Sequence, residues 1–291
     1  MLNFGTATID TISDLDRFAL PIDLLFPGRK IETLEPHRAD LAPYHVDFDA
    51  GEILLGVHSH LVRIGGRTIL IDTCVGEHKP RPRRPDWDQR ASSGYLERLA
   101  RAGLRPEEID IVMCTHLHTD HVGWNTQLVD GRWVPTFPNA RYLIGRAEFD
   151  HWQARELASP GVHNHGCFND SVMPVIEAGL ADFVEDGFDI GGGLSLTALP
   201  GHTPGQLGLC LCHGTQQALF CADAVHSPVQ VYQPEWTSRF CSDPAMAVET
   251  RLKLFDRFAE TGNLLIPAHL RYFPAMRIEA SDSGFVPGFV T

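Results

Sequence analysis

The stretch CTHLHTDHVGWN, residues 114–125, places three histidines and one aspartate within six consecutive positions, His116 to His121. A His-x-His pair on extended chain points both imidazoles to one side. The turn that follows allows Asp120 and His121 to reach a neighbouring position. Imidazole and carboxylate together favour zinc or a similar first-row divalent ion. The stretch therefore predicts a metal site, and the turn within it would let these side chains bind two adjacent ions.

Three further candidate ligands lie later in the chain, each shortly after an apolar run. They are His202 in LPGHTPGQ, Asp223 in LFCADAVH and His269 in LIPAHL. Residues that follow buried strands tend to gather at one edge of a sheet. We expect these three side chains to share a rim with the histidine-rich stretch.

The elements that would position these residues are strands and helices in alternating groups. We expect a hairpin over 53–76 about Gly65-Gly66, a helix that stops near Gly103, and a buried strand over 109–115. A second series of strands follows over 193–225, then a helix over 243–260 and a strand that leads to His269. This order predicts an α/β layered domain.

The domain organisation is expected to be simple. Residues 1–50 contain several prolines and are predicted to be an irregular N-terminal extension packed on the main body, with 51–291 forming a single catalytic domain. The basic, proline-rich stretch over 77–90 is expected to be an exposed ordered loop or a lid. The sequence leaves open whether Lys79 to Arg84 form solvated surface, a lid or a subunit contact.

Charge and cysteine content restrict the class of partner and the compartment. The formal net charge of -13 disfavours nucleic acid and anionic membranes as partners, and a small-molecule substrate is expected instead. Seven cysteines, an odd number, mostly in apolar runs, indicate reduced thiols and a cytoplasmic protein. Cys210 and Cys212 are predicted to be packing residues rather than a metal site. Neither a signal segment nor a membrane span is expected, and homodimer formation is left open.

The motifs together resemble a known family. THLHTDH fits the H-x-H-x-D-H signature of the metallo-β-lactamase superfamily, and PGHTPG, CAD and PAH match its later metal-binding elements in order. The resemblance covers residues 50 to 272. It implies an αββα sandwich, with two mixed β-sheets flanked by helices and a binuclear metal site at one edge.

The resemblance also implies a role for each ligand. One ion would be bound by His116, His118 and His202, the other by Asp120, His121 and His269, with Asp223 bridging both. Two Zn²⁺ ions are expected, and the same ligands accept Mn²⁺ or Fe²⁺. Asp72 matches an aspartate that is placed to orient a ligand histidine. Cys74 stands where many relatives have glycine, which leaves the local turn in question.

Two ions that share a water lower its pKa and generate hydroxide, so hydrolysis is the expected chemistry. Asp120 is predicted to pass a proton to the leaving alkoxide of a lactone or carboxylic ester. His226 occupies a position where acyl-homoserine lactonases often carry tyrosine. It is predicted to donate to the developing oxyanion or to shape the pocket, with a purely structural part as the alternative. Trp124, Phe149, Trp152 and Trp236 are candidate pocket residues, with the core as the alternative for each.

Other functions are weighed against this one. A phosphotriesterase-like hydrolase using the same metal pair is the main alternative, because His226 and the following VQ segment resemble organophosphate-hydrolysing members. A non-catalytic binding protein is less favoured, since every expected ligand position is filled. A nuclease is disfavoured by the acidity of the chain. His163 and His165 form another His-x-His pair, but no strand precedes them, and they are not expected to bind metal.

Overall fold

The computed structural model describes residues 1–282 and 284–291. The chain divides into two compact units. The first comprises Met1–Leu15 and Val57–Asp186, and the second comprises Asp16–Gly56 and Gly187–Thr291. The predicted division into an extension over 1–50 and one catalytic domain over 51–291 stays a prediction.

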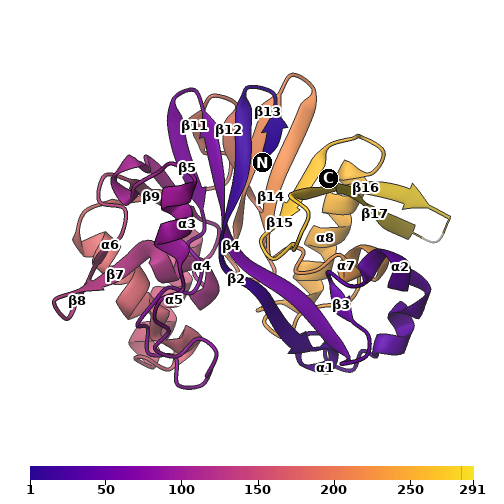
Figure 1. The fold of residues 1–291 in the computed structure, drawn as a ribbon, viewed down its shortest axis with the longest axis horizontal. Coiled ribbons are helices and arrows are strands. Elements are labelled where there is room, and N and C mark those ends of the chain that lie inside the picture. Colours follow the sequence, from indigo (N-terminus) through magenta and orange to yellow (C-terminus); the bar gives the residue numbers. More distant parts are fainter. Residues whose placement is uncertain (283) are drawn as a thin grey trace. The chain divides into compact units, whose positions relative to one another are not determined.

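The first unit contains most of an eight-stranded sheet with the order β1-β2-β4-β5-β6-β9-β10, and β3 pairs with β4 (Figure 1). The strands of this sheet are β1 (Leu2–Phe4), β2 (Ala7–Pro21), β3 (Val46–Asp47), β4 (Glu52–Ile64), β5 (Arg67–Ile71), β6 (Ile111–Cys114), β9 (Arg141–Gly145) and β10 (Ala181–Val184). The strands β7 (Thr126–Val129) and β8 (Arg132–Pro135) form a separate hairpin.

Tight turns explain the two hairpins of this unit. Gly65 and Gly66 both have positive φ angles, of 58° and 77°, and join β4 to β5 as predicted. Asp130 and Gly131 have φ angles of 49° and 76° and join β7 to β8. Two consecutive residues with positive φ match the twist of the flanking strands, which is why such turns favour glycine and aspartate.

Parallel pairing places the candidate ligands of the first unit. Strands β5, β6, β9 and β10 are parallel neighbours, with Ile71 opposite Met113 and Cys114 opposite Ile144. Because their carboxyl ends share one sheet edge, the residues that follow β5 and β6 lie beside one another. The predicted strand over 109–115 is confirmed as β6.

Helices follow and cover these strands. They are α3 (Tyr95–Arg101), α4 (Thr119–Val122), α5 (Arg146–Ala158) and α6 (Met173–Glu177). Helix α3 is followed by Gly103, whose φ of 80° is the left-handed conformation that commonly ends a helix. The helix predicted to stop at this glycine is therefore confirmed.

The second unit has a seven-stranded sheet with the order β11-β12-β13-β14-β15-β16-β17. Its strands are β11 (Asp189–Gly191), β12 (Leu194–Ala198), β13 (Leu207–His213), β14 (Gln216–Ala222), β15 (Leu264–Pro267), β16 (Ala275–Ser281) and β17 (Gly284–Val290). Only β14 and β15 pair in parallel within this sheet, among the described residues. Their carboxyl ends therefore bring Asp223 and His269 to one edge.

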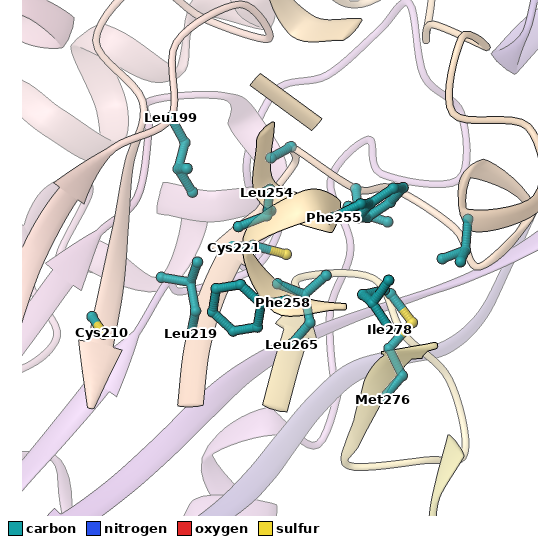
Figure 2. Packing of buried hydrophobic residues seen from close by; sticks show 13 residues of the cluster. Leu199, Cys210, Leu219, Cys221, Leu254, Phe255, Phe258, Leu265, Met276 and Ile278 are labelled. Atoms are coloured by element: carbon teal, nitrogen blue, oxygen red, sulfur yellow. The ribbon is translucent and has the colours of Figure 1, made fainter. Parts of the chain in front are cut away.

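Helix α8 (Pro244–Phe258) covers one face of this second sheet (Figure 1). Asp243 caps its first turn, since the Asp243 carboxylate accepts the Met246 N–H at 3.0 Å. Figure 2 shows Leu254, Phe255 and Phe258 of the helix packed with Leu219 and Leu265 of the sheet. These apolar contacts fix the helix on the strands that carry the candidate ligands. The remaining short helices of this unit are α1 (Ile22–Leu25), α2 (Arg38–Leu41) and α7 (Val229–Tyr232).

The expectation of irregular structure near the N-terminus is wrong for residues 7–21. These residues form β2, in which buried Ala7, Ile9, Phe18 and Leu20 alternate with more exposed positions. Alternation of this kind is typical of a half-buried strand. The prolines on which the expectation rested come at the end of this strand and beyond it.

The basic stretch over 77–90 is an ordered loop with many exposed residues, as expected, but two of its charged side chains are not exposed. Lys79 and Arg81 are fully buried, and the guanidinium of Arg81 donates two hydrogen bonds to the Asp170 carboxylate, at 2.7 and 2.8 Å. The Lys79 ammonium lies 3.6 Å from Asp170 Oδ1 and 3.6 Å from the centre of the Trp133 ring. Burial lowers the pKa of Lys79 to about 7. These charges are buried because Asp170 and an aromatic ring compensate them.

All seven cysteines are free thiols. Among the described residues, no helix has the length and apolar character needed to cross a membrane.

His45, in the second unit, is a buried histidine in an aromatic environment. Its ring stacks on Phe289 with centroids 4.9 Å apart and lies 5.9 Å from Phe273. Neither ring nitrogen has a hydrogen-bond partner in the part of the chain that the structure describes. Burial, with a smaller contribution from the positive charge of Arg271, lowers the pKa of His45 to about 3.

His45 should therefore make the protein sensitive to acid. Below pH 6.5 the unfolded chain takes up a proton at His45 that the folded chain does not, so stability falls as the pH drops towards 3. The loss is on the order of 3 kcal/mol at pH 4. We expect His45→Phe to unfold at higher denaturant concentration than the wild type, with a gap that widens from pH 7 to pH 4. His213→Gln, at an exposed site, is the control, and parallel pH profiles for His45→Phe and wild type would contradict the prediction.

Candidate functional site

The end of β6 places the first two predicted ligands. His116 follows the strand by two residues and is fully buried, and His118 immediately precedes α4. His116 Nε2 lies 3.1 Å from His118 Nδ1, so the structure brings this His-x-His pair together. Helix α4 carries Asp120 and His121, whose Oδ1 and Nε2 atoms are 3.9 Å apart.

Asp72 fixes the orientation of His121. Its carboxylate lies 2.8 Å from His121 Nδ1 and accepts the backbone N–H and the hydroxyl of Thr115, each at 2.8 Å. A carboxylate can only accept, so Nδ1 of His121 carries a proton in this contact. The nitrogen left to bind a metal is therefore Nε2. The contact predicted between Asp72 and a candidate ligand histidine is present.

A close backbone approach holds the loop after β5 against the turn after α4. The Thr73 N–H donates to the His121 carbonyl at 2.7 Å. A Cβ atom on Gly123 would lie 1.9 Å from the Val75 carbonyl oxygen, so only glycine fits there. Cys74 adopts a φ of 56°, a left-handed backbone that glycine adopts without strain. A glycine at this position would adopt the same backbone without strain.

Two side chains distant in sequence hold the segment between His116 and His118. Glu148 of α5 is buried, and its Oε1 atom accepts the Leu117 N–H at 3.0 Å and the Trp152 indole N–H at 2.7 Å. Asn164 accepts the Thr119 N–H at 3.1 Å and donates to the Leu117 carbonyl. Neither residue is predicted from the sequence. No local pattern in the sequence marks Asn164. Glu148 could have been noticed only as an acidic residue at a buried position of a helix.

In the second unit, Asp223 lies among three histidines. Its carboxylate oxygens are 3.3 Å from His202 Nε2, 3.3 Å from His226 Nε2 and 3.2 Å from His269 Nε2. All four side chains are buried. The structure therefore brings together the three predicted ligands of this unit and adds His226, which the sequence assigned to catalysis.

Backbone contacts hold these side chains in place. His269 Nδ1 donates to the Gly56 carbonyl at 2.8 Å. A Cβ on Gly201 would lie 2.3 Å from the Ala247 nitrogen, so glycine is needed for the His202 loop to approach α8. The His226 N–H donates to the Gln230 side chain at 2.7 Å.

The donor set fits a divalent metal ion. Because a neutral His269 has its proton on Nδ1, its Nε2 presents a lone pair to Asp223 Oδ1, and two acceptors at 3.2 Å need a proton or a metal ion between them. Ligand atoms about 2.1 Å from one tetrahedral ion lie about 3.4 Å apart, which is close to the separations seen here. Imidazole and carboxylate ligands suit zinc and its first-row neighbours.

Most of the aromatic residues predicted as candidates for a substrate pocket lie in the hydrophobic core. Trp124 stacks on Tyr95, Phe149 packs on Phe168 and Trp236 packs on Phe26. Trp152 differs, because its ring lies 5.4 Å from that of His118.

The second His-x-His pair does not form a site. Within the described residues, no group of three or more suitable ligand atoms includes His163 or His165. His163 contacts Arg155 at 3.1 Å instead. The expectation that this pair does not bind metal stays a prediction.

Comparison with known proteins gives the family. Residues 53–269 match the sequence profile of the metallo-beta-lactamase superfamily, which is most of the chain. The chain belongs to this superfamily.

Individual superfamily relatives are more distant. An N-acyl homoserine lactonase from a Bacillus species is 25% identical over 156 residues, which are 53% of this chain and 54% of the relative. A ribonuclease Z from Mycobacterium avium (strain 104) is 33% identical over 79 residues, 27% of this chain and 22% of the relative. The match thus spans about half the length of the first relative and less of the second.

Solved structures show the metallo-β-lactamase fold. The hydrolase AbOPH of the beta lactamase superfamily has a TM-score of 0.80 at 24% identity, with 99% of this chain and 95% of that chain covered. AidC, a dizinc quorum-quenching lactonase, has a TM-score of 0.77 at 19% identity, with 100% and 96% covered. The predicted α/β class with two mixed sheets and flanking helices is confirmed.

The contacts of Glu148 generate a stability prediction. Glu148→Ala should leave the Leu117 N–H and the Trp152 indole N–H without this buried acceptor, and lower the free energy of unfolding by about 2 kcal/mol or more. Urea unfolding measures the change. Glu148→Gln keeps a carbonyl oxygen and should recover part of the loss, whereas an alanine variant as stable as wild type would show that these bonds contribute nothing.

Proposed function

We propose that this protein is a binuclear metal-dependent hydrolase that cleaves a lactone or carboxylic ester of a small molecule. His116, His118 and His202 are proposed to bind one ion, Asp120, His121 and His269 the other, and Asp223 both. The observation that carries this proposal is the buried Asp223 carboxylate with three imidazole nitrogens at 3.2–3.3 Å. Membership of the superfamily supports the assignment of the remaining ligands.

A bound pair of divalent ions activates water and polarises a carbonyl oxygen. The chain's own residues would hold and move the protons. Asp120 has the most exposed carboxylate of the candidate ligands, at 18% of the side chain, and is proposed to pass a proton to the leaving alkoxide. Asp72 would keep His121 in one tautomer throughout, because its carboxylate holds the Nδ1 proton.

Zinc is the proposed native ion, because imidazole-rich sites with carboxylates suit it and a structural relative is described as a dizinc lactonase. Mn²⁺ and Fe²⁺ are accepted by the same donors.

The substrates of similar proteins favour a lactone as the substrate. The relative from Bacillus is an N-acyl homoserine lactonase, and AidC is described in complex with a product, N-hexnoyl-L-homoserine. The net charge of -13 argues against polyanionic substrates such as RNA. A phosphotriesterase-like activity at the same site is the alternative, motivated by His226.

A substrate comparison tests the proposal. The purified protein, with its metal content measured, is assayed against an N-acyl homoserine lactone, an aryl carboxylic ester and an aryl phosphotriester. The highest kcat/KM is expected for the lactone or the ester. Preference for the phosphotriester would favour the alternative, and a fully metal-loaded protein inert to all three would indicate a binding function.

Asp223→Asn should lower the metal content below two ions per chain and reduce turnover by about 100-fold or more, because a neutral amide is a poor bridging ligand. Metal analysis and steady-state kinetics measure the two effects. Asp256→Asn, at an exposed position on α8, is the matched control. Two ions and wild-type turnover in Asp223→Asn would exclude the bridging role.

His226→Gln separates catalysis from metal binding. His226 Nε2 lies 3.3 Å from Asp223, within reach of a metal at that carboxylate. If His226 acts on the substrate, the variant should keep two ions and lose about 10-fold or more in kcat. Loss of an ion would instead indicate that His226 is a metal ligand. Wild-type metal content and wild-type kcat would indicate that its part is purely structural.

A further inference from the structure

Two thiols lie together on the outer part of the second unit, on strand β13. Cys210 Sγ and Cys212 Sγ are 3.6 Å apart. The two residues are two positions apart in a strand, so their side chains point to the same face of the sheet. Among the described residues, no other two cysteine sulfur atoms are in contact.

The two thiols differ in their exposure to solvent. Cys210 is 6% exposed and lies at the margin of the apolar cluster under α8, on the strand next to the one that carries Leu219 (Figure 2). Cys212 is exposed. A reagent in solution can therefore reach Cys212 first and then meet Cys210 without any rearrangement of the sheet.

The surroundings of the pair include a positive charge. Arg257 of α8 donates to the Gln217 side chain at 2.8 Å, and Gln217 is the residue opposite Cys212 on β14. Burial and the neighbouring thiol raise the pKa of Cys210 to about 12, and Arg257 acts in the opposite direction. Cys210 is thus a thiol at neutral pH, and binding of a cation to both sulfurs must release its proton.

The separation of the sulfurs suits chelation better than disulfide formation. Two thiolates at about 2.3 Å from one tetrahedral ion are about 3.8 Å apart, close to the distance observed. A disulfide needs sulfurs at about 2.05 Å and Cα atoms typically about 5.5–6 Å apart, whereas positions i and i+2 of a strand are about 6.5–7 Å apart. Chelation fits the observed sulfur separation directly, whereas a disulfide would have a Cα separation at the upper end of the usual range.

We propose that Cys210 and Cys212 form a bidentate dithiol site for thiophilic metal species, separate from the hydrolytic site. On the neighbouring strand β14, Cys212 is opposite Gln217, Cys210 is opposite Leu219, and Asp223 follows the end of the strand. Four to six residues of strand therefore separate the thiols from Asp223, about 13 to 20 Å. Soft cations and trivalent arsenic favour thiolate ligands, whereas the His and Asp ligands suit harder ions. The expectation that the two cysteines serve only as packing residues is thereby replaced for Cys212, which is exposed.

Phenylarsine oxide is a suitable probe. Its arsenic forms two As–S bonds with the two thiols, the two thiol protons and the oxide oxygen leave as one water, and the oxidation state of arsenic is unchanged. We expect one adduct per wild-type chain by intact mass, stable to excess 2-mercaptoethanol and reversed by a dithiol. Cys210→Ser and Cys212→Ser should each form no adduct that survives the monothiol, because each leaves a single As–S bond.

Two comparisons make the result decisive. Cys221→Ala removes one buried thiol from the same sheet and should keep the adduct, which controls for thiol number. Cys212→Ser changes only an exposed side chain, so its folding is not in doubt and its result stands alone. Persistence of the adduct in Cys212→Ser, or its absence from the wild type, would overturn the proposal whatever the outcome for hydrolysis.

Discussion

The buried carboxylate of Asp72 is the contact on which the geometry of the first unit depends. It joins the end of β5 to the end of β6 through Thr115 and to helix α4 through His121. A buried carboxylate is tolerated only where hydrogen bonds or positive charge compensate it, so these partners must all be in place when the unit folds. The tautomer of His121, and with it the nitrogen that faces outward, follows from that one requirement.

In the second unit, the candidate ligand histidine His269 is oriented by a different kind of hydrogen-bond acceptor. His269 donates its Nδ1 proton to the carbonyl of Gly56, where His121 donates to a carboxylate. Both contacts direct Nε2 towards a candidate metal. A carboxylate partner raises the basicity of an imidazole more than a neutral carbonyl does. The Nε2 atoms of the two histidines therefore differ as electron-pair donors to a metal, and that of His121 is the stronger one.

The sequence predicts the parts of the site that depend on local order along the chain. His116, Asp223 and His269 each follow a short apolar strand, and that position is visible in the hydrophobic pattern. Glu148 and Asn164 could not be found in this way, because their contacts with Leu117 join residues 31 and 47 positions apart. Strand β2 was missed for a different reason, since its alternation is weak and prolines follow it.

The burial of Arg81 in the basic loop depends on long-range contacts as well, and it bears on the segment that carries the candidate ligands. Arg81 pairs with Asp170, 89 positions away, and also donates to the carbonyl of His165 at 3.0 Å. The adjacent Asn164 holds Leu117 and Thr119 by hydrogen bonds. Asn164 and His165 have φ angles of 46° and 55°, a left-handed conformation that is less favourable than the right-handed one although Asn and His adopt it more readily than most residues. A buried ion pair contributes little net stability compared with apolar packing. We infer that the pair of Arg81 and Asp170 instead helps to fix the turn at residues 164–165 beside the histidine-bearing loop.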